Sequence, residues 1–218
     1  MPTGPIQEVA KLHSSPCTIV EGSFNNFQTE NDAIAISALR NLEVPENAIQ
    51  QGLQASPPCR VQTWLPNQLA QIFPNIPLPK ALILDVAHNP DGIGRLMAIL
   101  RQRFPETSMR FVVGLSKNKD IATCLSLISH AASHIHLIEA NNDRAAPITI
   151  LLEALTAQGF SAKAITCESS ISLAIHNAVA IAGQQANEIV IVCGTFFIMA
   201  DARAALGIVE PQDASPLQ

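Results

Sequence analysis

ALILDVAHNP, residues 81–90, is the stretch that decides the fold, because it begins as an apolar run and ends in polar groups. Its first four residues, with Val86 following, predict a β-strand that is buried on both faces. Such a strand has no room for an unpaired charge, so Asp85 near its end needs a partner. A helical pattern follows over residues 93–104. Ligands of open α/β sheets bind where the carboxyl end of a strand turns toward a helix, so we expect the functional centre at this turn.

Two side chains of this turn are candidates for ligand binding. The Asp85 carboxylate can accept hydrogen bonds from ligand hydroxyls such as those of a ribose, and the His88 ring can stack on or hydrogen-bond the same ligand. The alternative is structural: Asp85 caps the following helix, and His88 is an ordinary surface residue. Gly92 and Gly94 do not make a dinucleotide-binding fingerprint, because the third glycine of GxGxxG is replaced by Met97.

Strand and helix patterns alternate after residue 80. We predict strands at 81–86, 109–114, 134–138, 162–166 and 188–193. We predict helices between them at about 93–103, 119–130, 147–158, 169–183 and 196–206. These lengths indicate right-handed crossovers, so the expected class is α/β, with a Rossmann-like, mostly parallel sheet flanked by helices.

The first eighty residues give weaker signals. Cys17 to Val20 is compatible with a short strand, and apolar spacing predicts a helix over 33–42 that either Thr29 or Asn31 caps. A second short helix is expected from Pro45 through Leu53. The segment 63–80 carries four prolines, which indicates a linker between two domains: Pro66, Pro74, Pro77 and Pro79.

The composition of the chain argues against several classes of function. The chain has 218 residues, of which 48% are hydrophobic and 14% charged, so it can bury a sizeable core. A net charge of −5 without a Lys/Arg cluster argues against nucleic-acid binding. Apolar runs are too short for a membrane span, and residues 1–10 lack a signal pattern. Five scattered cysteines without a CxxC pair indicate free thiols, so we expect a cytoplasmic protein.

The remaining polar clusters do not add up to a known catalytic set. His130, His134 and His136 lack a carboxylate or thiol at a spacing that would complete a metal site, so we expect none. Arg144 follows the third strand and would share a sheet edge with Asp85, where it could meet an anion or an acidic neighbour. The sequence contains no Gx4GK[ST], GxSxG or HExxH motif.

Several segments together resemble one family. Residues 84–90, LDVAHNP, resemble the D-x-AHNP signature of the folylpolyglutamate synthase and dihydrofolate synthase branch of the Mur ligase family. Weaker matches follow the same order as in that branch: Glu30-Asn31 with the helix 33–42, Pro58-Cys59-Arg60-Val61-Gln62 against PGR-x-[EQ], Lys119-Asp120, Arg144 with Pro147, and Gly194-Thr195. Cys59 stands where the motif has glycine, which affects the turn that aims Arg60.

The resemblance implies an ATP-dependent acid–amino-acid ligase. In this family the substrate carboxylate takes the γ-phosphate of ATP, and the amine of glutamate then attacks the acyl phosphate. Carried over residue by residue, Asn31 would contact the adenine side of the nucleotide, Arg60 its phosphates and Asp85 its ribose. His88 would lie near both nucleotide and substrate and is the expected catalytic residue.

The resemblance also implies partners and a domain layout. The expected ligands are ATP with Mg²⁺, L-glutamate, and dihydropteroate or a reduced folate. The family's P-loop and Mg²⁺ ligands precede the matching segments, so we expect the chain alone to be inactive and the full-length protein to be a monomer. The expected layout is a remnant of the central ATP-binding domain (1–62), a linker (63–80), a Mur-ligase-type C-terminal domain (81–210) and a tail (211–218). The alternatives are another Mur-type amide ligase and a non-catalytic α/β ligand-binding domain.

Overall fold

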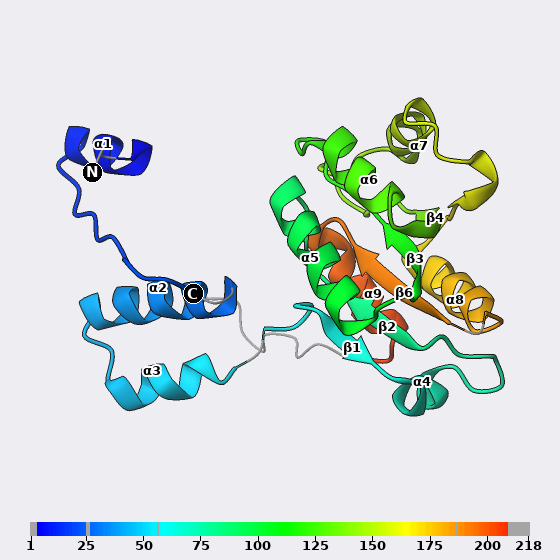
Figure 1. The fold of residues 1–218 in the computed structure, drawn as a ribbon, viewed down its shortest axis with the longest axis horizontal. Coiled ribbons are helices and arrows are strands. Elements are labelled where there is room, and N and C mark those ends of the chain that lie inside the picture. Colours follow the sequence, from blue (N-terminus) through cyan, green and yellow to red (C-terminus); the bar gives the residue numbers. More distant parts are fainter. Residues whose placement is uncertain (1–3, 25–26, 56, 186, 209–218) are drawn as a thin grey trace. The chain divides into compact units, whose positions relative to one another are not determined.

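The chain folds into two compact units that divide between Pro57 and Pro58. The structure, a computed structural model, describes residues 4–24, 27–55, 57–185 and 187–208 (Figure 1). No helix in these ranges is long and apolar enough to cross a membrane. The expected tail over 211–218 lies outside the described residues.

The N-terminal unit contains three helices: α1 (Pro5–Leu12), α2 (Phe27–Asn41) and α3 (Glu46–Leu53). The helix expected over 33–42 is present but begins earlier, so Thr29 and Asn31 lie inside it and the capping prediction is wrong. Glu30 in the first turn and the hydrogen bond from Gln28 to Asp32 favour this longer helix. The short strand expected at Cys17 to Val20 is absent from the described structure.

The C-terminal unit is built on one six-stranded sheet. Its strands are β1 (Gln62–Trp64), β2 (Ala81–Leu84), β3 (Ser108–Val113), β4 (Ala132–Leu137), β5 (Ile165–Cys167) and β6 (Glu188–Cys193). The spatial order is β1-β2-β6-β3-β4-β5, and every pair is parallel except β1 with β2. The predicted α/β class with a mostly parallel sheet is confirmed.

Helices cover both faces of this sheet and enclose two apolar cores. The helices α5 (Pro90–Arg103), α6 (Ile121–Ser129) and α7 (Ile148–Ala157) pack on one face. The opposite face carries α4 (Pro66–Ile72), α8 (Ile171–Ala182) and α9 (Met199–Ala205). Two short 3₁₀ turns, Ala162–Ala164 and Phe196–Ile198, complete the fold.

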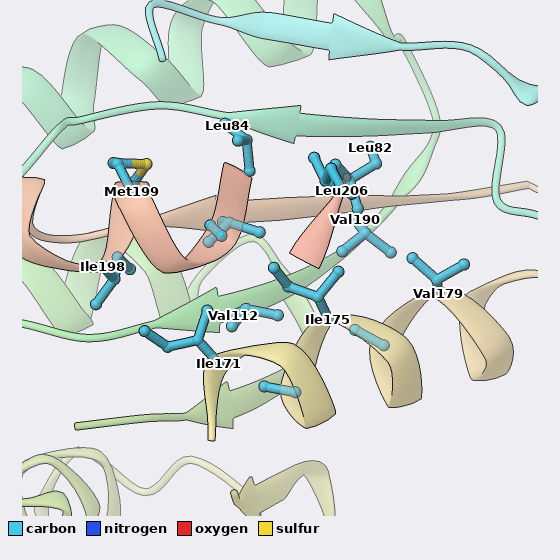
Figure 2. Packing of buried hydrophobic residues seen from close by; sticks show 14 of the residues in the cluster. Leu82, Leu84, Val112, Ile171, Ile175, Val179, Val190, Ile198, Met199 and Leu206 are labelled. Carbon is cyan, nitrogen blue, oxygen red and sulfur yellow. The ribbon is translucent and has the colours of Figure 1, made fainter. Parts of the chain in front are cut away.

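The apolar core on the face of α4, α8 and α9 shows why the strand sequences are continuous apolar runs. Alternate strand residues such as Leu82, Val112 and Val190 point toward the face that carries α8 and α9, where Ile175 and Leu206 lie (Figure 2). The residues between them face α5, α6 and α7 instead. Because both faces are covered, each strand is apolar at nearly every position.

The segment 63–80 differs from the expected linker. Trp64 in β1 and Leu69 in α4 are buried in the C-terminal unit, together with Phe73. Pro66 takes the first position of α4, where a proline is tolerated because that backbone N–H has no intrahelical partner. The prolines therefore mark the ends of short packed elements, and the boundary falls at Pro57.

Candidate functional site

The Asp85 carboxylate joins two backbone segments just after β2. Its Oδ2 accepts a hydrogen bond from the N–H of Val61 and its Oδ1 from the N–H of Ala87, both at 2.8 Å. The residue is only 7% exposed. Burial raises the pKa of this carboxyl group, while the two backbone N–H groups and the charge of Arg60 oppose the shift. The partner that the sequence predicts for buried Asp85 is therefore a pair of backbone N–H groups.

Arg60 occupies a tight turn that Asp85 helps to hold. The residues on either side of it, Cys59 and Val61, both have left-handed backbones, with φ of 58° and 48°. Such values cost about 1–3 kcal/mol for residues other than glycine. The N–H of Val86 donates to the Cys59 carbonyl at 3.0 Å, and the Cys59 side chain is buried. Arg60 itself is exposed, with no hydrogen bond or ion pair to any described residue.

His88 is held in one tautomer by the chain around it. Its Nδ1 lies 2.8 Å from the carbonyl oxygen of Val86. A carbonyl can only accept, so Nδ1 carries the proton and donates it, which leaves the Nε2 lone pair of the neutral ring for a ligand. The next residue, Asn89, accepts the N–H of Gly92 at 2.7 Å and caps α5. Asn89, and not Asp85, is therefore the helix cap.

The end of β6 lies against the same turn. The N–H of Gly194 donates to the Ala87 carbonyl at 2.8 Å, with φ of 114° at Gly194. Thr195 accepts the N–H of Phe197 at 3.4 Å and shares a hydrogen bond of 3.1 Å with the Ser116 hydroxyl. These contacts fix three strand ends at one edge of the sheet.

Basic residues gather in the loops at this edge. The backbone N–H of Lys117 donates to the carbonyl of Arg144 at 2.9 Å, which joins the loops after β3 and β4. The Arg144 guanidinium lies 5.8 Å from the centre of the Phe197 ring, a cation–π distance. Lys117 and Arg144 are exposed, as is Arg60. This edge therefore suits an anionic ligand.

The histidines of β4 belong to a separate buried polar network. Arg110 Nε lies 3.2 Å from Glu188 Oε2, and Arg110 Nη1 lies 3.4 Å from His136 Nε2. Arginine only donates, so His136 Nδ1 carries the proton and donates it to Glu168 at 3.1 Å. Burial lowers the pKa of His136, and it lowers that of His134 to about 4. Both rings are neutral parts of the sheet face near α8.

The structure brings together three of the four residues predicted to contact the nucleotide. Arg60 lies on the segment before β1, and Asp85 and His88 lie on the segment after β2. Hydrogen bonds from Val61 N–H to Asp85 and from Val86 N–H to the Cys59 carbonyl join the two segments. Asn31 is exposed in α2 of the N-terminal unit. Gln62 was not among the predicted residues, although its side chain also bonds this turn. Its only sequence signal is its place in the PGR-x-[EQ] match.

Fold and site together define the class of the protein. Residues 74–196 match the family model described as Mur ligase, glutamate ligase domain, and the chain belongs to this family. The mostly parallel sheet flanked by helices agrees with the Rossmann-like fold of this family. Its candidate ligand-binding side chains lie at the carboxyl ends of the strands, where ligands of such sheets bind.

The similar proteins are folate-type ligases. The dihydrofolate synthase/folylpolyglutamate synthase of Escherichia coli K12 is 30% identical over 173 residues, which cover 78% of this chain and 36% of that protein. The folylpolyglutamate synthase of Lacticaseibacillus casei is 32% identical over 120 residues, covering 52% and 25%. A crystal structure of a bifunctional folylpolyglutamate synthase/dihydrofolate synthase with Mn, AMPPNP and L-glutamate bound is 33% identical, with a TM-score of 0.60, and the match covers 81% of this chain and 39% of that one. The chain thus spans well under half the length of these relatives.

Proposed function

We propose that this chain is the C-terminal part of an ATP-dependent ligase that adds glutamate to dihydropteroate or a reduced folate. The observation that carries the proposal is the grouping of Arg60, Asp85 and His88 at the carboxyl edge of the sheet. The likeness to folate-type ligases supports the choice of substrate class. We also propose that the chain acts in the cytoplasm and that residues 1–57 continue a central ATP-binding domain.

The nucleotide would be held mainly by Arg60 and Asp85. The exposed Arg60 guanidinium offers paired N–H donors to phosphate oxygens, and this geometry suits the charge that spreads over a transferring phosphoryl group. Each Asp85 oxygen accepts one backbone N–H and has a further lone pair that a ribose hydroxyl can use. Asn31, in the N-terminal unit, keeps the role that the family resemblance alone implies, a contact to the adenine side of a nucleotide.

His88 would act on the attacking amine. The amine of glutamate must lose protons as it attacks the acyl phosphate and displaces phosphate. The Nε2 lone pair of His88 is the acceptor that its Nδ1–H bond to Val86 leaves free. His88 would therefore orient the amine and accept its proton.

The divalent cation belongs to another part of the enzyme in this proposal. The described residues hold no group of three or more His, Cys, Asp or Glu side chains that could bind a metal ion. We assign the Mg²⁺ ligands to the part of the ligase that carries the P-loop, called here the P-loop-bearing part. When bound, Mg²⁺ would offset negative charge on the phosphates.

The test is glutamate-dependent phosphate release from ATP. The chain is assayed alone and mixed with a separately expressed P-loop-bearing part of the Escherichia coli relative, with dihydropteroate or tetrahydrofolate as acceptor. We expect activity only in the mixture, a loss of at least about 100-fold in Asp85→Ala and His88→Ala, and wild-type rates in the exposed control Asp201→Ala.

Two outcomes contradict the proposal. One is an inactive mixture in which the P-loop-bearing part is shown to fold and bind ATP. The other is full activity in Asp85→Ala and His88→Ala. Activity with a different acid acceptor but with neither pteroate nor folate would favour another Mur-type amide ligase.

A further inference from the structure

We propose that Gln62 and Arg203 form a bridge that positions Arg60 for the phosphates of the nucleotide. The inference rests on the proposed function and deepens it, because it assigns a positioning role to two residues away from the strand-end turn. Neither side chain needs to touch the nucleotide. Their role is to hold the backbone from which Arg60 projects.

One oxygen atom makes both bonds of the bridge. Gln62 Oε1 accepts the backbone N–H of Cys59 at 3.0 Å and Arg203 Nη1 at 3.0 Å. A carboxamide oxygen has two lone pairs, so both acceptor sites are used. Gln62 lies in β1 directly opposite Leu84, the residue before Asp85. The bridge therefore starts beside the carboxylate that holds the other end of the Arg60 turn.

The Arg60 turn needs such support because its backbone is unfavourable. Cys59 and Val61 are both left-handed, and Val61 is β-branched, for which a positive φ is an outlier. A conformation of this kind persists only where the surroundings enforce it. Asp85 holds the turn after Arg60 through the Val61 N–H, and Gln62 holds it before Arg60 through the Cys59 N–H.

Arg203 ties the turn to the body of the domain. It lies in α9, whose Met199 and Ala202 are buried in the apolar core beside α8. A side-chain oxygen at position 62 suits the task, since it accepts from Arg203 and from the Cys59 N–H at the same time. The turn is thus anchored on one side by β2 and on the other by α9.

A matched glutamine in the same chain provides the control. Gln68 Oε1 accepts the backbone N–H of Leu65, three residues earlier, at 3.0 Å, the same local bond that Gln62 makes to Cys59. Gln62→Leu and Gln68→Leu therefore remove equivalent side chain to backbone bonds. Only the first removes contact with Arg203. Gln62→Glu keeps the acceptor.

The first measurement is amide hydrogen exchange in the whole chain, followed residue by residue with NMR. In Gln62→Leu we expect exchange at Cys59 and Val61 to rise roughly tenfold, because the turn opens more often. Gln68→Leu should leave both rates unchanged, and Gln62→Glu should keep them near wild type. Arg203→Met is the second variant, used if Gln62→Leu does not fold. It leaves the bond from Cys59 to Gln62 in place, so it should raise the exchange rates of Cys59 and Val61 by less than Gln62→Leu does.

The second measurement is steady-state kinetics of the mixture with the P-loop-bearing part. We expect Gln62→Leu to raise KM for ATP about tenfold while KM for glutamate stays within about twofold, because only phosphate binding depends on Arg60. A purely structural defect would lower the active fraction and hence kcat, and would leave KM for ATP unchanged. Gln62→Glu should restore KM for ATP.

Unchanged exchange at Cys59 and Val61 in Gln62→Leu would overturn the bridge. Faster exchange with an unchanged KM for ATP would show that the bridge holds the turn without positioning Arg60, and this also overturns the proposal. An inactive wild-type mixture contradicts the proposed function, and with it the assignment of Arg60 to a nucleotide. The exchange rates then still decide whether the bridge holds the turn.

Discussion

Gly194 is the point where β6 leaves the sheet and its backbone comes close to that of Gly114. A Cβ atom at position 194 would lie 2.4 Å from the Gly114 carbonyl oxygen, and φ there is 114°. We predict that Gly194→Ala lowers the free energy of unfolding by about 3 kcal/mol, from strain and displacement together. Urea denaturation measures this loss.

A glycine in a helix provides the opposite expectation. A Cβ at Gly94, inside α5, would meet no atom within 4 Å. Gly94→Ala should raise the free energy of unfolding by about 0.5–1 kcal/mol, because alanine loses less backbone entropy in a helix. Equal effects of the two substitutions would contradict the close approach of Gly194 to Gly114.

Residue chemistry could be predicted from the sequence where it depends on near neighbours. That Asp85 needs a partner follows from the apolar run before it. Its partner Val61 could not be predicted, because 24 residues separate the two in the chain. The left-handed backbone at Val61 gave no signal either, since valine disfavours that conformation; at Cys59 the glycine of the resembled motif was the only indication.

The parallel strands are the elements that the sequence predicts best. Four apolar residues in a row, as in β2, indicate a strand buried on both faces when strand and helix patterns alternate along the chain. By contrast, β1 has three residues, too few to show a period of two, and it pairs antiparallel at the edge. Prolines nearby favoured a linker, so β1 and α4 were missed.

Strand β3 carries a buried ion pair that should be important for stability. The side chains of Arg110 and Glu188 are only 8% and 2% exposed, and Glu188 also accepts from Ser133. Arg110→Met would leave the Glu188 charge without its ionic partner, so we predict a loss of about 3–5 kcal/mol in the free energy of unfolding. Thermal or urea unfolding provides the measurement.

The matched experiment removes both charges. Arg110→Met combined with Glu188→Gln should be more stable than Arg110→Met alone, because no uncompensated carboxylate remains. The exposed pair of Arg40 and Glu46 is the control, and Arg40→Met should change stability little. Additive effects of the two substitutions at β3 and β6 would refute the coupling.

The histidines on β4 predict a pH dependence of stability. Burial, followed by the charges of His136 and Arg110, lowers the pKa of His134 to about 4 from an unfolded value near 6.5. The folded state therefore resists protonation, so the stability that neutral His134 contributes is present above pH 6.5 and is lost as pH falls toward 4. The stability of wild type minus that of His134→Gln should decrease over this range.

Urea unfolding at several pH values between 4 and 7 measures that difference. His134→Gln can keep a hydrogen bond to Thr166, which now lies 2.8 Å from His134 Nε2, so packing is largely preserved. The same substitution at the exposed His130 controls for a general effect of pH. A constant difference between wild type and His134→Gln from pH 7 to 4 would refute the prediction.

The two units of the molecule differ in how much apolar surface they bury. The C-terminal unit encloses both cores, whereas among the described residues of the N-terminal unit Ile49 is the one classed as buried. Ile6 and Leu42 in that unit are 79% and 73% exposed. Helices of this length gain most of their stability from packing. The N-terminal unit should therefore open far more often than the sheet.

Amide hydrogen exchange of the chain, first alone and then with the P-loop-bearing part, tests this difference. Alone, we predict fast exchange throughout α1, α2 and α3 and slow exchange in β2, β3 and β6, whose opening requires loss of both cores. If the N-terminal unit continues a central ATP-binding domain, the P-loop-bearing part should cover its apolar side chains and slow exchange in α2 and α3. Strong protection of α1 to α3 in the monomeric chain alone would contradict the prediction, because the unit would then be stable without further packing.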